Sequence, residues 1–209
     1  MVELKVCITF TEELLGTCSG NPELHAQFIA SKSADAARMA EELAALPAVE
    51  LEDQSKTVFP RMADGRPFLW DYQLKGFFKD ACLAMMDSDE TCLSTVEGQK
   101  RLGLTKYMNK RTIDNQLFIA PRQCVLQLPA GGVIGQCQRP LRAMTMRGER
   151  IALAHSETVP IGTKLSATIT LLNARLENFV REALAFGRLK GLGQWRNSGK
   201  GRFGVVVDA

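Results

Sequence analysis

Strict alternation of apolar and polar side chains marks two segments of the chain as half-buried strands. In residues 2–11 the apolar positions are Val2, Leu4, Val6, Ile8 and Phe10. In residues 163–172 they are Leu165, Ala167, Ile169 and Leu171. Each segment is predicted to lie in a sheet that is covered on one face.

A helical period follows at two other places. After Asp71, the expected cap, apolar residues fall at i, i+3, i+4 and i+7 spacing at Leu74, Phe77, Phe78, Ala81 and Met85. After Asn173, a second expected cap, the apolar face consists of Leu176, Phe179, Val180, Ala183 and Leu184. Gly187 is predicted to end this second helix.

Weaker signals divide the rest of the chain. Residues 15–22 read as a turn of small residues, followed by a short helical pattern through Leu24, Phe28 and Ile29. A second helix is expected over residues 34–46, with Ser33 as its cap and Pro47 as its stop. Further strands are predicted near residues 57–59, 116–120, 124–128, 150–158 and 203–207. Residues 87–112 read as an insertion, and residues 129–149 as a projecting loop or hairpin.

This order predicts an α+β fold: a ferredoxin-like (RRM-like) sheet with two helices packed on one face and a glycine-rich loop before the last strand. The length of 209 residues suits one enlarged domain, so residues 1–209 are interpreted as a single domain.

Composition narrows the class of protein. With 45% apolar and 23% charged residues, the chain has the balance of an ordinary globular protein. No apolar run reaches the length of a membrane span and no export signal is visible, so we expect a cytoplasmic protein without membrane partners. The six cysteines contain no Cys-x-x-Cys pair, which favours reduced thiols, with no metal site and no cofactor.

The charge is unevenly distributed. Residues 1–98 hold 8 basic and 17 acidic side chains, whereas residues 99–209 hold 18 basic and 6 acidic ones. The two parts therefore carry formal charges of −9 and +12. This polarisation favours a polyanionic partner, although two parts that simply complement each other would look the same.

The most informative segment is residues 191–204, which contain five glycines. Glycine lets a backbone come close to a bulky partner, and Arg196, Lys200 and Arg202 supply cations with no acid among them. Trp195 adds a ring on which a base can stack. The predicted nucleic-acid contacts are Gly191, Gly193, Trp195, Arg196, Gly199, Lys200 and Arg202. The alternative is a mobile hairpin with a solvated basic face.

Two further groups of cations are candidates for contacts with a polyanion. Lys75 and Lys79 share a helix face and are either solvated lysines or phosphate contacts, and Gly76 beside them suggests the close approach of another backbone. Arg139, Arg142 and Arg147 are spaced with methionines between them. That segment predicts either a helix or hairpin that grips RNA, or a basic loop with Met144 and Met146 packed on the core.

Three segments resemble the RAMP superfamily, the RNA-binding subunits of CRISPR effector complexes. The run 191–203 resembles their glycine-rich loop, Asp71-Tyr-Gln-Leu-Lys75-Gly76-Phe-Phe-Lys79 resembles a helix start in their backbone subunits, and residues 159–169 resemble the strand before their last helix. The chain is also similar to small stand-alone proteins of this type carried by bacterial viruses. The resemblance implies a RAMP-type fold and an RNA partner.

Catalytic signals are weak. The RNA-cleaving members of that superfamily carry an aspartate soon after the first strand, but residues 15–22 contain no acid. Its processing endonucleases rely on histidine, and this chain offers only His25 and His155. No serine elbow, P-loop or dinucleotide fingerprint is present.

The favoured function is a non-catalytic RNA-binding protein that grips the phosphate backbone. The alternative is a viral counter-defence protein that binds a nucleotide immune messenger or mimics a CRISPR backbone subunit. A third hypothesis is an RNA or nucleotide phosphodiesterase that uses His25 or His155. A protein partner in an immune complex, and assembly as a monomer, dimer or head-to-tail filament, remain open.

Overall fold

The computed structural model describes residues 1–32, 35–47, 55–146 and 148–208, and an antiparallel sheet carries its core. The sheet order is β11 (Phe203–Asp208), β1 (Val2–Phe10), β10 (Lys164–Leu171), β7 (Gln123–Gln127) and β5 (Phe68–Trp70). Strand β6 (Leu117–Ala120) also pairs with β10, next to β7. The predicted strands at residues 2–11 and 163–172 are confirmed, and they pair with each other.

The alternating pattern decides which side chains enter the core. Leu4, Ile8 and Phe10 of β1 are fully buried, while Glu3 and Lys5, on either side of Leu4, are exposed. In β10, Leu165, Ile169 and Leu171 are likewise fully buried. Since a strand turns successive side chains to opposite faces, one face of the sheet is apolar and the other polar.

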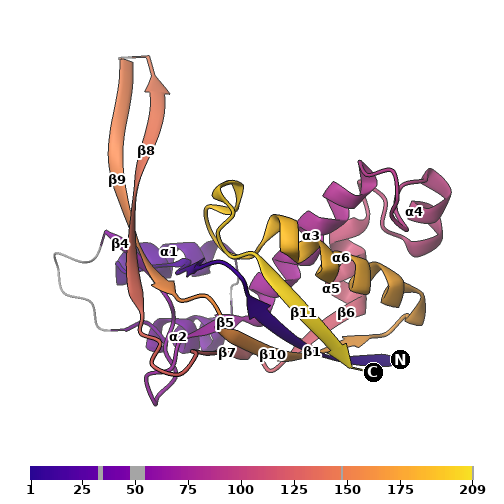
Figure 1. Ribbon diagram of the computed structural model, residues 1–209, viewed down its shortest axis with the longest axis horizontal. Helices are drawn as coiled ribbons and strands as arrows, with labels where there is room; N and C mark the ends of the chain where they lie inside the picture. Colours follow the sequence, from indigo (N-terminus) through magenta and orange to yellow (C-terminus); the bar gives the residue numbers. More distant parts are fainter. Residues whose placement is uncertain (33–34, 48–54, 147, 209) are drawn as a thin grey trace.

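Helices α3 (Asp71–Met86) and α6 (Glu177–Lys190) cover the apolar face of this sheet (Figure 1). The rings of Phe78 and Phe179 lie 6.4 Å apart between the two helices. With α3 after β1 and α6 after β10, the chain follows a β-α-β-β-α-β order in which β6 and β7 together take the second strand position. The predicted α+β, ferredoxin-like arrangement is confirmed.

Two predicted helix ends differ from the structure. Asp71 is the first residue of α3, and Trp70 is its N-cap, because the buried strand β5 passes directly into the helix and the Trp70 N–H donates to the Gln73 side chain. Gly187 lies inside α6, which runs on to Lys190 and ends at Gly191. A Cβ at Gly187 would lie 2.1 Å from the ring of Phe203, so this glycine serves close packing of the helix on β11.

A second sheet joins three short strands from the segment between β1 and α3 to two long strands from residues 135–159. Its order is β2 (Leu14–Leu15), β9 (Gly148–Val159), β4 (Lys56–Val58) and β3 (Cys18–Ser19), and β8 (Gly135–Thr145) also pairs with β9. Helices α1 (Pro22–Lys32) and α2 (Ala36–Ala44) come from the same segment. The Asp35 side chain caps α2, whereas the expected cap, Ser33, lies outside the described residues.

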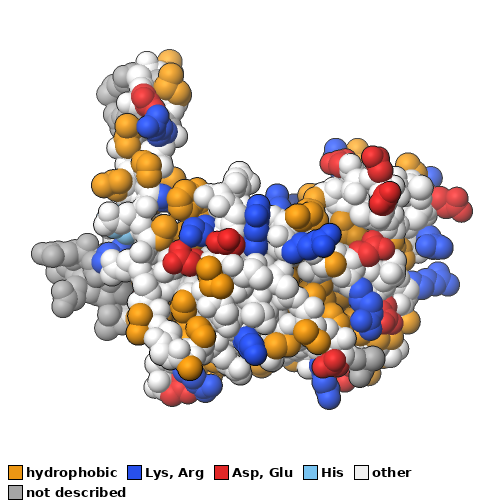
Figure 2. All heavy atoms as spheres, in the orientation of Figure 1, with side chains coloured by type: hydrophobic (Ala, Val, Ile, Leu, Met, Phe, Trp, Pro, Cys, Tyr) orange, Lys and Arg blue, Asp and Glu red, His pale blue; other side chains and the backbone are white. Residues whose placement is uncertain are grey.

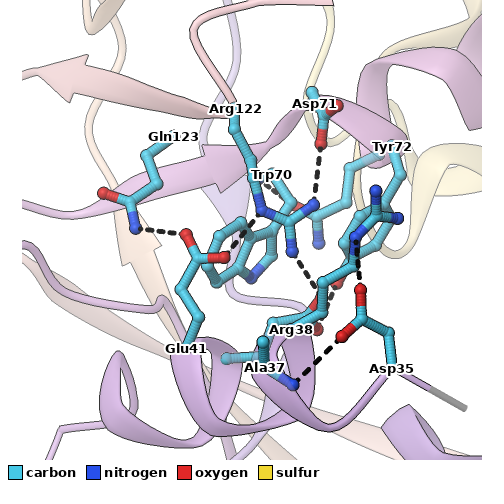
Figure 3. Close-up of polar contacts among 11 residues, drawn as sticks. Asp35, Ala37, Arg38, Glu41, Trp70, Asp71, Tyr72, Arg122 and Gln123 are labelled. Carbon is cyan, nitrogen blue, oxygen red and sulfur yellow. Dashed lines mark hydrogen bonds and ion pairs between the residues drawn. The ribbon is translucent and has the colours of Figure 1, made fainter. Parts of the chain in front are cut away.

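Arg122 ties α2 to the main sheet (Figure 3). Its guanidinium donates to Glu41 at 2.9 Å and to Glu42 at 3.2 Å, and it lies 4.9 Å from the centroid of the Trp70 ring. The Tyr72 hydroxyl donates to the other oxygen of Glu42 at 3.2 Å. This network therefore holds a surface helix against the start of α3.

The predicted insertion at residues 87–112 covers two short helices, α4 (Val96–Leu102) and the beginning of α5 (Asn109–Gln116). Leu93, Leu102, Leu104 and Ile113 are buried in the main core and anchor this segment. The 3₁₀ turns η2 (Ala174–Leu176), capped by Asn173, and η3 (Arg196–Ser198) complete the described elements.

Strands β8 and β9 form a long hairpin that stands out from the body of the molecule (Figure 1). The predicted strand at residues 150–158 lies in its second arm, and its first arm, β8, falls within the segment 129–149, for which the sequence predicts a projecting loop or hairpin. Within the described parts of the chain, no helix is long and apolar enough to cross a membrane.

Candidate nucleic-acid interface

Residues 191–202, here called the glycine loop, connect α6 to β11 and are tied together at their two ends. The Leu192 N–H donates to the Gly201 carbonyl at 2.8 Å, and the Gly201 N–H donates to the carbonyl of Glu13 at 2.8 Å. Gly201 has a φ of +70°, and a Cβ there would lie 2.0 Å from the Leu192 carbonyl oxygen. Only glycine fits this crossing of two backbones, so the loop has a fixed base.

Trp195 lies at the outer part of the loop with its backbone at φ 56° and ψ 35°. A residue other than glycine costs about 1 kcal/mol or more in this left-handed region of backbone conformation. Backbone strain of this kind clusters at functional sites. The indole is 38% exposed. The loop therefore presents a partly exposed ring at a cost in backbone energy.

Arg139 of β8 reaches this ring. Its guanidinium carbon lies 5.3 Å from the centroid of the Trp195 ring, and its Nη2 donates to the Gln194 side chain at 2.8 Å. The Nε of Arg139 is buried and has no hydrogen-bond partner within the described residues. The structure thus joins two predicted site segments, the hairpin and the glycine loop, through a cation stacked on an aromatic ring.

The other cations of the loop meet acids that are distant in sequence. Arg196 lies 2.7 Å from Asp80 of α3, and Lys200 lies 2.7 Å from Glu13. The hydrogen bond to the Glu13 carboxylate raises the pKa of Lys200. The exposed Arg202 donates to the Leu189 carbonyl at 3.2 Å. The acid-free run in the sequence is therefore partly neutralised by carboxylates of other elements.

A hollow of about 260 Å³ separates the glycine loop from α3. It is lined by Thr17, Gln73, Gly76, Asp80, Gly193 and Arg196, among others. A Cβ at Gly76 would meet nothing within 4 Å, so the expected close approach of a backbone at this glycine is wrong. Gly76 instead opens the wall of the hollow.

Lys75 and Lys79 point to a different side of α3. They line a hollow of about 700 Å³ together with Tyr72, Asp114 and Phe118. Lys79 lies 2.6 Å from the Asp114 carboxylate, and Lys75 donates to the Asp114 carbonyl at 3.2 Å over the ring of Phe118. Burial lowers the pKa of Lys75. The structure does not place these lysines at the glycine loop itself.

A third hollow, of about 350 Å³, lies between the other two. It shares Thr17 and Gln73 with the hollow at the glycine loop, and Phe28 and Tyr72 with the hollow at the lysines. The Gln73 side chain donates to Thr17 Oγ1 where these spaces adjoin. The three hollows thus follow one another around the first turns of α3.

The remaining predicted residues lie apart from the loop. Arg142, near the hairpin tip, lies 3.8 Å from Glu149, and Arg147 lies outside the described residues. Met144 and Met146 are 86% and 107% exposed, so the alternative that packs them on the core is wrong. They project into solvent from the outer part of the hairpin.

The two histidines occupy separate elements. His25 of α1 is only 3% exposed, and its burial lowers its pKa. His155 is half-buried in β9 at the base of the hairpin. Of the two, only His25 lines one of the three hollows around α3, the middle one.

Sequence reasoning missed Glu13 and Asp80, the partners of the loop cations Lys200 and Arg196, and Gln194, the loop residue that binds Arg139. Nothing in the local sequence signals these contacts, because each joins segments that only the fold brings together. Asp80 follows Lys79 on α3, and the sequence analysis assigns it no role.

Comparison with known proteins supports the fold. No family model matches the chain, and no curated protein matches it. A chain in the cryo-EM structure of the Type III-B Cmr-beta bound to cognate target RNA is similar, with a TM-score of 0.52 and 10% identity. That match covers 99% of this chain and 59% of the neighbour. A chain of a Type IV-B CRISPR complex gives a TM-score of 0.49 at 13% identity, covering 100% and 91% of the two chains.

The chain therefore shares its ferredoxin-like α+β fold with a chain of the Cmr-beta structure. This agrees with the α+β, ferredoxin-like fold that the order of strands and helices in the sequence predicted.

Proposed function

We propose that this protein binds single-stranded RNA, without cleaving it, at the surface formed by the glycine loop and β8. The observation that carries the proposal is the stack of Arg139 on the partly exposed ring of Trp195, within a loop whose strained backbone holds the ring in place. Proteins that bind single strands combine cations that follow the phosphates with aromatic rings on which bases stack.

The hollows around α3 give such a strand a path. The space beside Gly193 and Arg196 leads past Thr17 and Gln73 to the space that Lys75 and Lys79 line. A strand that leaves the loop in this direction meets both predicted groups of cations in turn. The Cmr-beta neighbour, which has the same fold, was solved bound to target RNA, and we extend that ligand class to this chain.

The counter-defence hypothesis uses the same surface with another ligand. A virus-encoded protein that captures a nucleotide immune messenger would bind one small nucleotide tightly at the hollow beside the loop. A mimic of a CRISPR backbone subunit would bind a protein partner instead. RNA binding and messenger binding predict different ligands, and one binding assay with RNAs and small nucleotides distinguishes them.

The test is fluorescence anisotropy with labelled RNA homopolymers of 4, 8 and 16 nucleotides, and with unlabelled mono- and cyclic nucleotides as competitors. We expect affinity to rise with length and to differ little between sequences. Combined Arg139→Gln and Trp195→Ala should weaken binding of every RNA, whereas Arg175→Gln, an exposed cation elsewhere, should not. Tight binding of a small nucleotide with weak RNA binding would favour the messenger hypothesis, and binding of neither would overturn the proposal.

A further inference from the structure

We propose that the turn between α4 and α5 carries a second RNA-binding surface, formed by five cations around Tyr107. The cations are Lys100, Arg101, Lys106, Lys110 and Arg111, and together with Tyr107 they are called the α4–α5 patch. The inference rests on the proposed RNA-binding function and adds a surface outside the glycine loop and the hollows around α3.

The cations of this patch are not neutralised by the protein. All five are exposed, and none forms an ion pair with another described residue. By contrast, Lys79, Arg196 and Lys200 each lie within 2.7 Å of a carboxylate. A phosphate that approaches the α4–α5 patch does not have to displace a carboxylate first, so its charge is available to a polyanion.

Tyr107 gives the patch an aromatic ring. It is 95% exposed, in a turn flanked by Lys106 and followed closely by Lys110. A ring of this kind is ordinarily at least partly buried, because it carries a large apolar surface. An exposed ring among cations is the combination that holds a base and its phosphate.

The fold does not require these side chains. Leu102, Leu104 and Ile113 anchor the segment in the core, and Thr112 Oγ1 donates to the Gly103 carbonyl at 2.6 Å. Lys100 and Arg101 lie in the last turn of α4, where the helix dipole favours cations. Lys110 and Arg111 lie in the first turn of α5, where the dipole disfavours them. Stability of α5 therefore does not explain the charge of its first turn.

The position of the patch suits a strand that also contacts the loop. In Figure 1 the glycine loop lies between the β8–β9 hairpin and α4, on the side of the sheet that the helices cover. Figure 2 shows several Lys and Arg side chains, with Asp and Glu side chains among them, at the end of the molecule where α4 lies. A strand held at the loop can continue in two directions, one through the hollows around α3 and the other toward the α4–α5 patch. An extended polyanion can contact the loop and the patch at once, which favours RNA over an acidic protein as the partner.

The experiment compares RNAs of 6 and 24 nucleotides. The patch variant combines Lys106→Gln, Lys110→Gln and Arg111→Gln, and a second variant, Tyr107→Ala, leaves the charge unchanged. The control combines Lys5→Gln, Lys164→Gln and Arg175→Gln, which removes three exposed cations from other elements. Thermal unfolding checks that each variant is folded.

We expect the patch variant to bind the 24-nucleotide RNA about tenfold more weakly, with its slope of log affinity against log salt reduced by about 2. Tyr107→Ala should weaken binding of the 24-nucleotide RNA and leave the affinity for the 6-nucleotide RNA unchanged. If the patch and control variants lose affinity for the 24-nucleotide RNA equally, or if neither loses affinity, the proposal of a second surface is overturned while the loop proposal stays intact. Failure of the unmodified protein to bind either RNA would overturn the proposed function and this inference with it.

Discussion

The guanidinium of Arg139 lies 5.3 Å from the centroid of the Trp195 ring, and the same guanidinium donates to Gln194, 55 positions further along the chain. This contact fixes the base of a projecting hairpin to a loop that has glycines at both of its ends. It also places a cation and an aromatic ring side by side at the surface, as a strand-binding site requires.

Trp195 is expected to contribute base stacking. Trp195→Ala should weaken RNA binding by about 1–3 kcal/mol, roughly 5- to 150-fold in affinity, because stacking on an aromatic ring is worth that much per base. Trp195→Phe should retain most of the affinity, since it keeps a ring under Arg139. Anisotropy titrations of both variants check this, and equal affinities for the two would contradict a stacking role.

Gly201 is expected to be essential for the shape of the loop. Gly201→Ala should lower the free energy of unfolding by on the order of 2 kcal/mol or more, because its Cβ would collide with the Leu192 carbonyl at a positive φ. Gly204→Ala is the matched control, because a Cβ there meets nothing within 4 Å. Urea unfolding should show the loss in the first variant only, and similar midpoints for both would contradict the crossing of backbones described here.

Asp80 is expected to restrain the affinity of the loop for RNA. Asp80→Asn removes the carboxylate that lies 2.7 Å from Arg196 and frees the guanidinium for a phosphate. RNA affinity should rise severalfold, because the phosphate no longer competes with a carboxylate for Arg196, while the number of phosphate contacts and therefore the salt slope should stay close to those of the unmodified protein. Asp208→Asn, an exposed acid on β11, controls for the change in net charge. An equal rise in both variants would show that Arg196 has no specific role.

Glu42 is expected to give the fold a pH dependence. Burial raises its pKa above the ordinary value of 4.5, so the folded state binds its proton more tightly than the unfolded state does. Its contribution to stability is therefore largest at low pH and is lost as the pH rises from 4.5 through the raised pKa. The midpoint temperature of thermal unfolding should fall less steeply with rising pH in Glu42→Gln than in the unmodified protein across this window. Parallel curves of midpoint against pH would contradict the raised pKa of Glu42 in the folded state.

The sequence predicts the strands and helices that follow a clear period. The alternation at residues 2–11 and the apolar face at Phe77 and Phe78 depend on local pattern alone, and both elements are confirmed. The predicted end of α6 at Gly187 is wrong. Glycine is typical of a helix end, but at this position it allows close contact with Phe203 on another element. Local sequence does not carry that information.

The candidate site was predictable only in part. The glycines and Trp195 stand out in the sequence, but the partners Asp80 and Glu13 lie in segments with no local signal for the contact. The position of Lys75 and Lys79 on a different side of α3 from the glycine loop follows from how the helix is rotated on the sheet, which packing of Phe77 and Phe78 decides.

The most direct test of RNA binding at the glycine loop is the salt dependence of the affinity for a single-stranded RNA. We predict that log affinity falls linearly with log salt, and that combined Arg139→Gln, Arg196→Gln and Lys200→Gln lowers this slope by about 2. The combined Lys5→Gln, Lys164→Gln and Arg175→Gln control should keep the original slope. A slope near zero in the unmodified protein, or the same slope in the loop variant and the control, would contradict the account.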